Sequence, residues 1–227
     1  MLSSIRNKDI RTLGYVLRRT NYGEADRVLN ILTPNGKVSA IAKGVRKEKS
    51  KLAGNIEMFT LVDFNLHKGK SELSVVTGAK MIKHYGEIVK DFDRMELTAM
   101  ILKRINKVAE SSDNLEFFKI VDQCLAALNQ KVSLDIVRAW FLLNLAKAMG
   151  EEINLYRDRD GKKLSAEKKY NWDNMEMVFV EDKNGDYGVD EIKLLRLIIS
   201  NDLKVVQRVR MKDGMMMPIL RLVQLVI

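Results

Sequence analysis

The sequence predicts an α+β protein in which a small β-domain comes first and helices follow. Short β-branched segments separated by turn residues fill the chain up to residue 85. Beyond that point, apolar residues recur at steps of three and four, as one buried helix face requires. The 227 residues can form one large domain or two small ones, each with its own core. We therefore expect a domain over residues 1–82 and a second over 83–227.

Five segments of the first domain have the composition of strands. They are residues 13–19, 27–33, 37–42, 58–68 and 73–77. The triplet Pro34, Asn35 and Gly36 is a strong turn signal between the second and third of these. Five short strands without a clear helix among them predict a small closed barrel, and the OB-fold is the common five-stranded Greek-key barrel. That fold is a known platform for oligonucleotides.

The second domain is expected to be helical, with a small β-hairpin inserted in it. Helical periodicity covers residues 88–108, 115–128, 134–149 and 192–199, and a last short helix should follow Pro218. Between them, residues 151–190 are polar and rich in turn formers. There we expect a hairpin with strands 176–180 and 187–189 around the turn at Asn184 and Gly185.

Positive charge is concentrated in the first part of the chain. Residues 1–85 contain 16 Lys and Arg against 7 Asp and Glu, a net charge of +9. The remaining residues carry 23 of each and are neutral, so the whole excess lies in the predicted β-domain. A segregated charge of this kind indicates a face for a polyanion.

Several function classes have no support in the sequence. Neither His67 nor His84 belongs to a nucleophile or metal motif, and no phosphate-binding glycine motif is present. We therefore expect no catalytic residues, no metal and no cofactor. The lone Cys124 suits a reducing compartment, the N-terminus has no signal-peptide pattern, and no apolar run nears the roughly 20 residues of a membrane span. We expect a cytoplasmic protein without a membrane partner.

The strongest local signal is a cationic loop between two predicted strands. Residues 43–51 contain five basic side chains and one acidic one. Such a loop could track a phosphate backbone, although charged loops often serve only solubility. Four further cations, Arg27, Lys37, Lys68 and Lys70, lie at strand ends of the same domain that could surround the loop, and we expect them to contact nucleic acid too. Among Tyr15, Tyr22, Phe59 and Phe64, most should fill the barrel and one or two could stack bases.

These segments resemble the RecO family of recombination mediators. The similarity lies in Gly14 to Leu17, Tyr22 to Arg27, Leu32 with Thr33, Ala42 to Lys47, Lys49 to Leu52, Gly54 and the aromatic Phe59. It is dense over residues 13–73, where order and spacing agree. The family's fold is an N-terminal OB barrel followed by a helical domain.

The resemblance implies a non-enzymatic role in DNA repair and recombination. Such proteins bind single- and double-stranded DNA, anneal complementary strands and, with RecR, help RecA displace single-strand-binding protein (SSB). By this resemblance the phosphate-contact candidates are Arg27, Lys43, Arg46, Lys47, Lys49 and Lys51. Glu24 and Asp26 could orient Arg27 or cap a turn, so Arg27 is either a DNA contact or a structural ion-pair residue. Gly44 and Gly54 would serve the geometry of the loop.

One departure from the family concerns zinc. Many members carry a four-cysteine zinc module after the third helix, but residues 151–190 contain neither Cys nor His. We expect the aromatic residues Tyr156, Tyr170, Trp172 and Phe179 to hold this insertion together. Two other functions stay open at this point: an OB-fold RNA-binding module in translation or RNA processing, and a scaffold whose loop only confers solubility.

Overall fold

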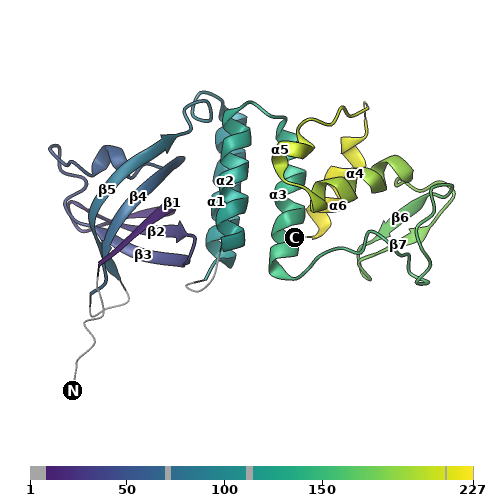
Figure 1. The fold of residues 1–227 in the computed structure, drawn as a ribbon, viewed down its shortest axis with the longest axis horizontal. Coiled ribbons are helices and arrows are strands. Elements are labelled where there is room, and N and C mark those ends of the chain that lie inside the picture. Colours follow the sequence, from purple (N-terminus) through teal and green to yellow (C-terminus); the bar gives the residue numbers. More distant parts are fainter. Residues whose placement is uncertain (1–8, 70–72, 111–114, 213, 227) are drawn as a thin grey trace, which may run out of the picture. The chain divides into compact units, whose positions relative to one another are not determined.

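The computed structural model of this chain describes residues 9–69, 73–110, 115–212 and 214–226 (Figure 1). Its contacts divide the chain into an N-terminal unit, Met1–Leu125, and a C-terminal unit, Ala126–Ile227. The division groups the first helix and most of the second with the strands. It is a division of contacts only, so the expected domain boundary between residues 82 and 83 stays a prediction.

Five strands form the core of the N-terminal unit. They are β1 (Asp9–Tyr22), β2 (Asp26–Thr33), β3 (Gly36–Ala42), β4 (Thr60–His67) and β5 (Ser74–His84). Their hydrogen bonds close into a ring in the order β1-β2-β3-β5-β4, in which the β3–β5 pair is parallel and the others are antiparallel. The predicted α+β class and the five strands are confirmed, with β1 and β5 longer than expected.

The alternation of the strands explains how the barrel is filled. Inward-facing residues of different strands meet in one apolar cluster that includes Leu29, Ile31, Phe64 and Leu66, all at most 1% exposed. Because the side-chain period of a strand is two, these positions alternate with exposed or half-buried ones. Burial of every second residue is the physical cause of this alternation.

Helix α1 (Phe92–Val108) lies along the barrel, and Asp91 caps its start by accepting the Arg94 N–H at 3.1 Å. The Asn30 side-chain amide on β2 donates to Asn106 Oδ1 at 2.9 Å. Lys37 on β3 donates twice to the C-terminal end of α1, from Nζ to the Asn106 carbonyl and from its backbone N–H to the Glu110 carbonyl. The ammonium thus satisfies a carbonyl that the helix itself leaves unpaired.

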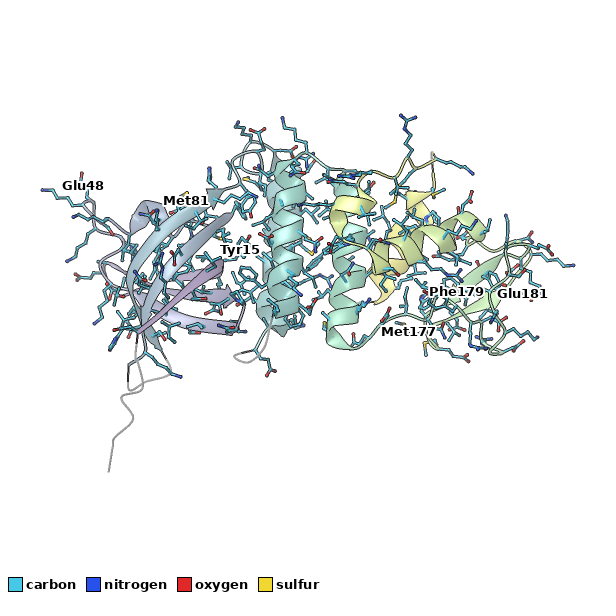
Figure 2. All side chains as sticks on the ribbon, in the orientation of Figure 1. Tyr15, Glu48, Met81, Met177, Phe179 and Glu181 are labelled. Carbon is cyan, nitrogen blue, oxygen red and sulfur yellow. The ribbon has the colours of Figure 1, made fainter. Side chains whose placement is uncertain are left out.

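A buried polar cluster connects α2 (Leu115–Asn129) to the barrel. The Tyr15 hydroxyl on β1 donates to Asp122 Oδ1 at 2.5 Å and lies 2.9 Å from the Tyr85 hydroxyl. The Tyr15 and Phe118 rings pack against each other in a tilted arrangement, with centroids 5.3 Å apart. Burial raises the pKa of Tyr15 far above its usual value and raises that of Tyr85 to about 12, so both hydroxyls stay protonated. Figure 2 shows Tyr15 on the side of the barrel that faces the helices.

The C-terminal unit is a helical layer built on α3 (Leu134–Met149). The other helices are α4 (Val189–Ser200), α5 (Leu203–Val206) and α6 (Met216–Val226), and α3 contacts each of them. Trp140 on α3 is buried, and its indole N–H donates to the Asn201 carbonyl at 2.8 Å. The α3 helix ends directly before Gly150, as expected. No helix in the described residues is long and apolar enough to cross a membrane.

The insertion contains a hairpin, and the first predicted strand, 176–180, overlaps an observed one, but the predicted partner strand 187–189 and the predicted position of the hairpin turn were wrong. The paired strands are β6 (Tyr170–Asp173) and β7 (Val178–Glu181), joined by a turn at residues 174–177. Tyr187 does not pair with β7. It exchanges two backbone hydrogen bonds with Tyr170, at 2.9 and 3.0 Å. The turn at Asn184 and Gly185 therefore folds the chain back onto the far edge of β6.

Aromatic side chains pack the insertion together, as expected for three of the four named residues. Phe179 lies edge-on to Tyr170, Trp172 and Tyr187, with ring centroids 6.4, 5.0 and 5.5 Å away. Tyr156 is outside this group, since it is exposed and lies under the Arg196 guanidinium at 4.8 Å. The four rings, Tyr170, Trp172, Phe179 and Tyr187, thus form the aromatic cluster of this short, polar segment.

Removing the Asp122 carboxylate should destabilise the N-terminal unit. Asp122→Ala removes the acceptor shared by two buried tyrosine hydroxyls, and because only one of them can then donate to the other, a buried donor is left unpaired, which typically costs about 1–3 kcal/mol. Glu116→Ala is the matched control, because Glu116 is an exposed acid on the same helix whose surface pair with Lys119 contributes little. Denaturant unfolding of both variants measures the difference, and equal stability would contradict a structural role for the cluster.

Adding a methyl group at Gly185 should disrupt the insertion. A Cβ atom there would lie 2.3 Å from the Tyr170 carbonyl oxygen, so the Tyr170–Tyr187 backbone pair must shift. We expect Gly185→Ala to lose about 1–3 kcal/mol of stability, as overpacking usually does. Gly54→Ala is the control, since nothing lies within 4 Å of its Cβ position. Thermal unfolding checks the prediction, and an unchanged transition for Gly185→Ala would refute it.

Candidate nucleic-acid interface

The basic loop, residues 43–51, leaves the barrel after β3 and leads through the short helix η1 (Ala53–Asn55) to β4. Its five cations are all exposed: Lys43, Arg46, Lys47, Lys49 and Lys51. None of them forms an ion pair with an acid that the structure describes. Figure 2 shows Glu48, the one acid of the loop, at its outer tip and pointing away from the barrel. The loop thus presents uncompensated positive charge to solvent.

The base of the loop is held rigidly, in contrast to its charged side chains. Asp26 Oδ1 accepts the Gly44 N–H at 2.6 Å, and the Ala25 carbonyl accepts the Arg46 N–H at 2.8 Å. Val45, between them, is buried in the barrel core. Gly44 has a φ of +63°, a conformation that residues with a Cβ adopt only at a cost. The chain therefore turns sharply out of β3 at a defined point.

The contacts of Asp26 and Arg27 bear on the two roles considered for Arg27. Asp26 accepts a hydrogen bond from the Gly44 N–H at the base of the loop. Of the two roles expected for the acids, orienting Arg27 or capping a turn, Asp26 therefore has the second. Arg27 is half-buried, donates from Nε to Asn21 Oδ1 at 3.3 Å and has no ion pair within the described part of the chain. Its strand partner on β3 is Ala42, the residue before the loop. Arg27 therefore lies beside the loop, held by an amide rather than by a carboxylate.

The remaining predicted cations lie in different surroundings. Lys37 is half-buried, and its ammonium is hydrogen-bonded to the end of α1. It precedes Lys43 by six residues, so an extended strand separates the two lysines by about 20 Å. Lys68 is exposed directly after β4. Its neighbour His67 pairs with Val75 of β5, and Val75 pairs with Ile41 of β3. His67 and Ile41 are therefore two strand spacings apart, about 10 Å. Lys70 lies outside the described residues. Of the two that the structure describes, Lys68 is the one the barrel brings toward the loop.

The aromatic candidates separate clearly by burial. Tyr15 and Phe64 are fully buried, and Phe59 is half-buried with a positive φ of 61°. Tyr22 is 61% exposed at the end of β1, directly before Gly23, whose carbonyl accepts a hydrogen bond from the Arg46 guanidinium at 3.2 Å. Tyr22 is therefore the aromatic side chain placed to stack on a base beside the loop.

The geometry offers phosphate binding and stacking rather than bond chemistry. In the described residues, no group of three or more His, Cys, Asp or Glu side chains could hold a metal ion. Burial raises the pKa of the Cys124 thiol, which keeps it protonated and unreactive. What the site contains is a fixed turn, exposed cations and an exposed ring. These are the parts of a surface for single-stranded or backbone-directed nucleic-acid binding.

Comparison with known proteins covers nearly the whole chain. Residues 8–85 match the family described as Recombination protein O N terminal, and residues 89–227 match Recombination protein O C terminal. A protein named DNA repair protein RecO from Roseiflexus sp. strain RS-1 is 33% identical over 153 residues, which is 67% of this chain and 54% of that protein. The protein of that name from Rubrobacter xylanophilus is 32% identical over 62% of this chain and 57% of its own length.

A third relative is similar over a longer part of the chain. The DNA repair protein RecO of Dehalococcoides mccartyi is 27% identical over 210 residues, which cover 89% of this chain and 83% of the relative. The matched region therefore spans a little over half of the Roseiflexus and Rubrobacter proteins and most of the Dehalococcoides one.

Loss of the Asp26 carboxylate should loosen the basic loop without unfolding the barrel. In Asp26→Ala the Gly44 amide loses its acceptor, so we expect amide hydrogen exchange at Gly44 and Arg46 to become at least about tenfold faster, the equivalent of about 1.4 kcal/mol. Glu24→Ala is the control, because Glu24 is exposed two residues earlier in the same turn. Equal exchange in both variants would show that Asp26 does not hold the loop.

Proposed function

This chain belongs to the RecO family of recombination proteins, and from that premise we propose that it is a DNA repair protein that binds DNA through its basic loop. The observation that carries the proposal is the loop itself: five exposed cations without acidic partners in the described residues, on a turn fixed by Asp26. Relatives named DNA repair protein RecO support the assignment.

The binding we propose is directed at the phosphate backbone and is independent of sequence. Lys43, Arg46, Lys47, Lys49 and Lys51 would contact phosphates, with Arg27 and Lys68 at the margin of the same surface. Ionic contacts of this type release counterions, so affinity falls steeply with salt. Tyr22 would add stacking that any base can provide, which is sequence-tolerant. Lys37 has the least support as a contact, since its ammonium is already bonded to α1.

We also assign the barrel to the OB-fold. Its strand order, with β1 between β2 and β4 and a parallel β3–β5 contact, suits a five-stranded Greek-key barrel. In that fold, loops between strands commonly form the oligonucleotide surface. The basic loop is such a connection, between β3 and β4.

The finer activities of the family follow as part of the same proposal. We expect the protein to bind single- and double-stranded DNA, to anneal complementary strands without a catalytic residue or cofactor, and to act with RecR in loading RecA onto strands coated by SSB. Because its proposed substrate is chromosomal DNA, we expect it to work in the cytoplasm. A cationic surface supports annealing physically, since it screens the repulsion between two phosphate backbones.

Reversing the charge of the basic loop should weaken DNA binding to all sequences alike. The variant combines Arg46→Glu, Lys47→Glu, Lys49→Glu and Lys51→Glu. Each lost contact lowers the log–log salt slope by about 0.7 on single strands, so the slope should fall by up to about 3. Strand annealing should slow in parallel, while stability changes little because the side chains are exposed. Fluorescence anisotropy at several salt concentrations measures the slope.

The control for this variant carries the same change of net charge elsewhere. Lys163, Lys169, Lys183 and Lys204 are exposed in the C-terminal unit, and their joint replacement by Glu tests the effect of charge alone. A folded loop variant that binds DNA like the control would place the binding surface elsewhere. A strong preference for RNA over DNA of the same sequence would instead favour an RNA-binding module.

A further inference from the structure

A second cationic surface lies in the N-terminal unit, in a groove between β1 and α1. The groove has a volume of about 1030 Å³ and is open to solvent. Half of its lining consists of cations: Arg18, Arg19, Lys103, Arg104 and Lys107. No acidic side chain is among the residues that line it. The basic loop contributes nothing to it, so this is a separate feature of the barrel.

The fold, rather than a run of sequence, brings these cations together. Lys103 and Lys107 are four residues apart on α1 and so project from one face of the helix. Arg18 and Arg19 are neighbours on β1, where a regular strand would turn one of them inward. The pairing of β1 with β2 shifts register between Val16 and Arg18, and both arginines are exposed after this bulge.

Three of the cations have no counter-charge among the residues that the structure describes. Arg18, Lys103 and Lys107 are exposed, and none forms an ion pair within the described ranges of the chain. Arg19 differs, because its guanidinium binds Glu57 at 2.5 Å. Like charges gathered around a concave surface raise its positive potential and attract an anion. The spacing along two elements suits a chain of anionic groups better than one small ion.

The floor of the groove is apolar. Leu17, Met58 and Met100 lie among the cations, and most of the groove's exposed area is carbon or sulfur. Methionine adapts to flat, polarisable partners such as aromatic rings. A ligand that carries both regular negative charge and flat apolar faces matches this lining. An unpaired nucleotide chain has both, whereas in a duplex the base faces are stacked inside.

Strand β1 also leads from the groove to the base of the basic loop. From Arg19, β1 runs through Thr20, Asn21 and Tyr22, all exposed, to Gly23, which contacts Arg46 of the loop. Four residues of extended strand span about 13 Å. Barrels of this size contact about 4–16 nucleotides, so one strand could reach from the groove to the loop. This connection favours a nucleic acid over an acidic peptide, which would need only the groove.

We propose that the groove between β1 and α1 binds single-stranded DNA, with phosphates at Arg18, Lys103 and Lys107 and bases on Met58 and Met100. The inference rests on the proposed DNA binding and adds a strand type and a second contact surface. The loop binds backbone phosphates of either form of DNA. The groove selects strands whose bases are free, and it extends the path of such a strand beyond Tyr22.

The test compares three variants of the full chain. The groove variant combines Arg18→Glu, Lys103→Glu and Lys107→Glu, and a milder one places Gln at the same positions in case the first does not fold. The control changes Lys163, Lys183 and Lys204 to Glu, for the same shift in net charge. For a 30-nucleotide single strand, we expect the salt slope of the groove variant to fall by up to about 2 relative to the control. Duplex binding of the two should agree within about twofold.

The outcomes separate this inference from the proposed function. If the loop variant loses DNA binding and the groove variant binds DNA like its control, the groove inference is wrong and the loop is still the proposed binding surface. If both bind like their controls, the proposed function itself fails. Equal loss of duplex and single strand in the groove variant would remove the single-strand assignment. Unchanged DNA binding with lost affinity for an acidic peptide would assign the groove to a protein partner.

A measurement on the unaltered chain gives an independent result. A single strand that carries a photoreactive thymidine should crosslink to peptides containing Met58 or Met100, as well as to the one containing Tyr22. Crosslinks to the groove should disappear when a duplex of the same sequence replaces the single strand. Crosslinks confined to the basic loop and Tyr22 would overturn the proposal.

Discussion

The N-terminal unit depends on one carboxylate that is held against two buried hydroxyls. Tyr15 of β1, Tyr85 after β5 and Asp122 of α2 come from distant parts of the chain and satisfy one another inside the fold. Unpaired, each group would cost free energy, so α2 cannot slide along the barrel without penalty. The same strand carries Arg18 and Arg19 and leads to the turn that supports the basic loop. Because β1 is held in place, the strand that carries the groove arginines and the turn that supports the basic loop are held in place too.

A second carboxylate acts in the same way at the surface. Asp26 accepts the Gly44 amide and so sets the point where the basic loop leaves β3. The cations beyond it stay free to adapt, while the backbone that carries them is held. A prearranged loop loses less conformational entropy when it binds, which suits weak, repeated contacts to a uniform backbone. Asp26 thus holds the backbone of the loop in place, while the exposed cations beside it provide the positive charge.

The sequence indicated some features well and misplaced others for physical reasons. Strand alternation and β-branched residues are local, so the five strands of the barrel were found, as was the loop between 43 and 51. The hairpin of the insertion was misplaced although Asn184 and Gly185 do form a turn. The strand that pairs with β7 is β6, which precedes β7 in the chain, and the segment after the turn pairs with β6 instead. A turn signal says where the chain reverses, but cross-strand packing of Tyr170, Phe179 and Tyr187 decides which segments pair.

By itself, the sequence determined the α+β class, the concentration of charge in the first 85 residues and the lack of thiolate zinc ligands in residues 151–190, because these follow from residue type and local period. Only the tertiary structure decided which cations act together. It turned Lys37 toward the end of α1, left Tyr22 exposed while burying Tyr15, and brought Arg18 to Lys103 across 85 positions of chain. The burial of a side chain and the proximity of two charges depend on packing between segments that are far apart in the sequence, and a local sequence pattern does not specify this packing.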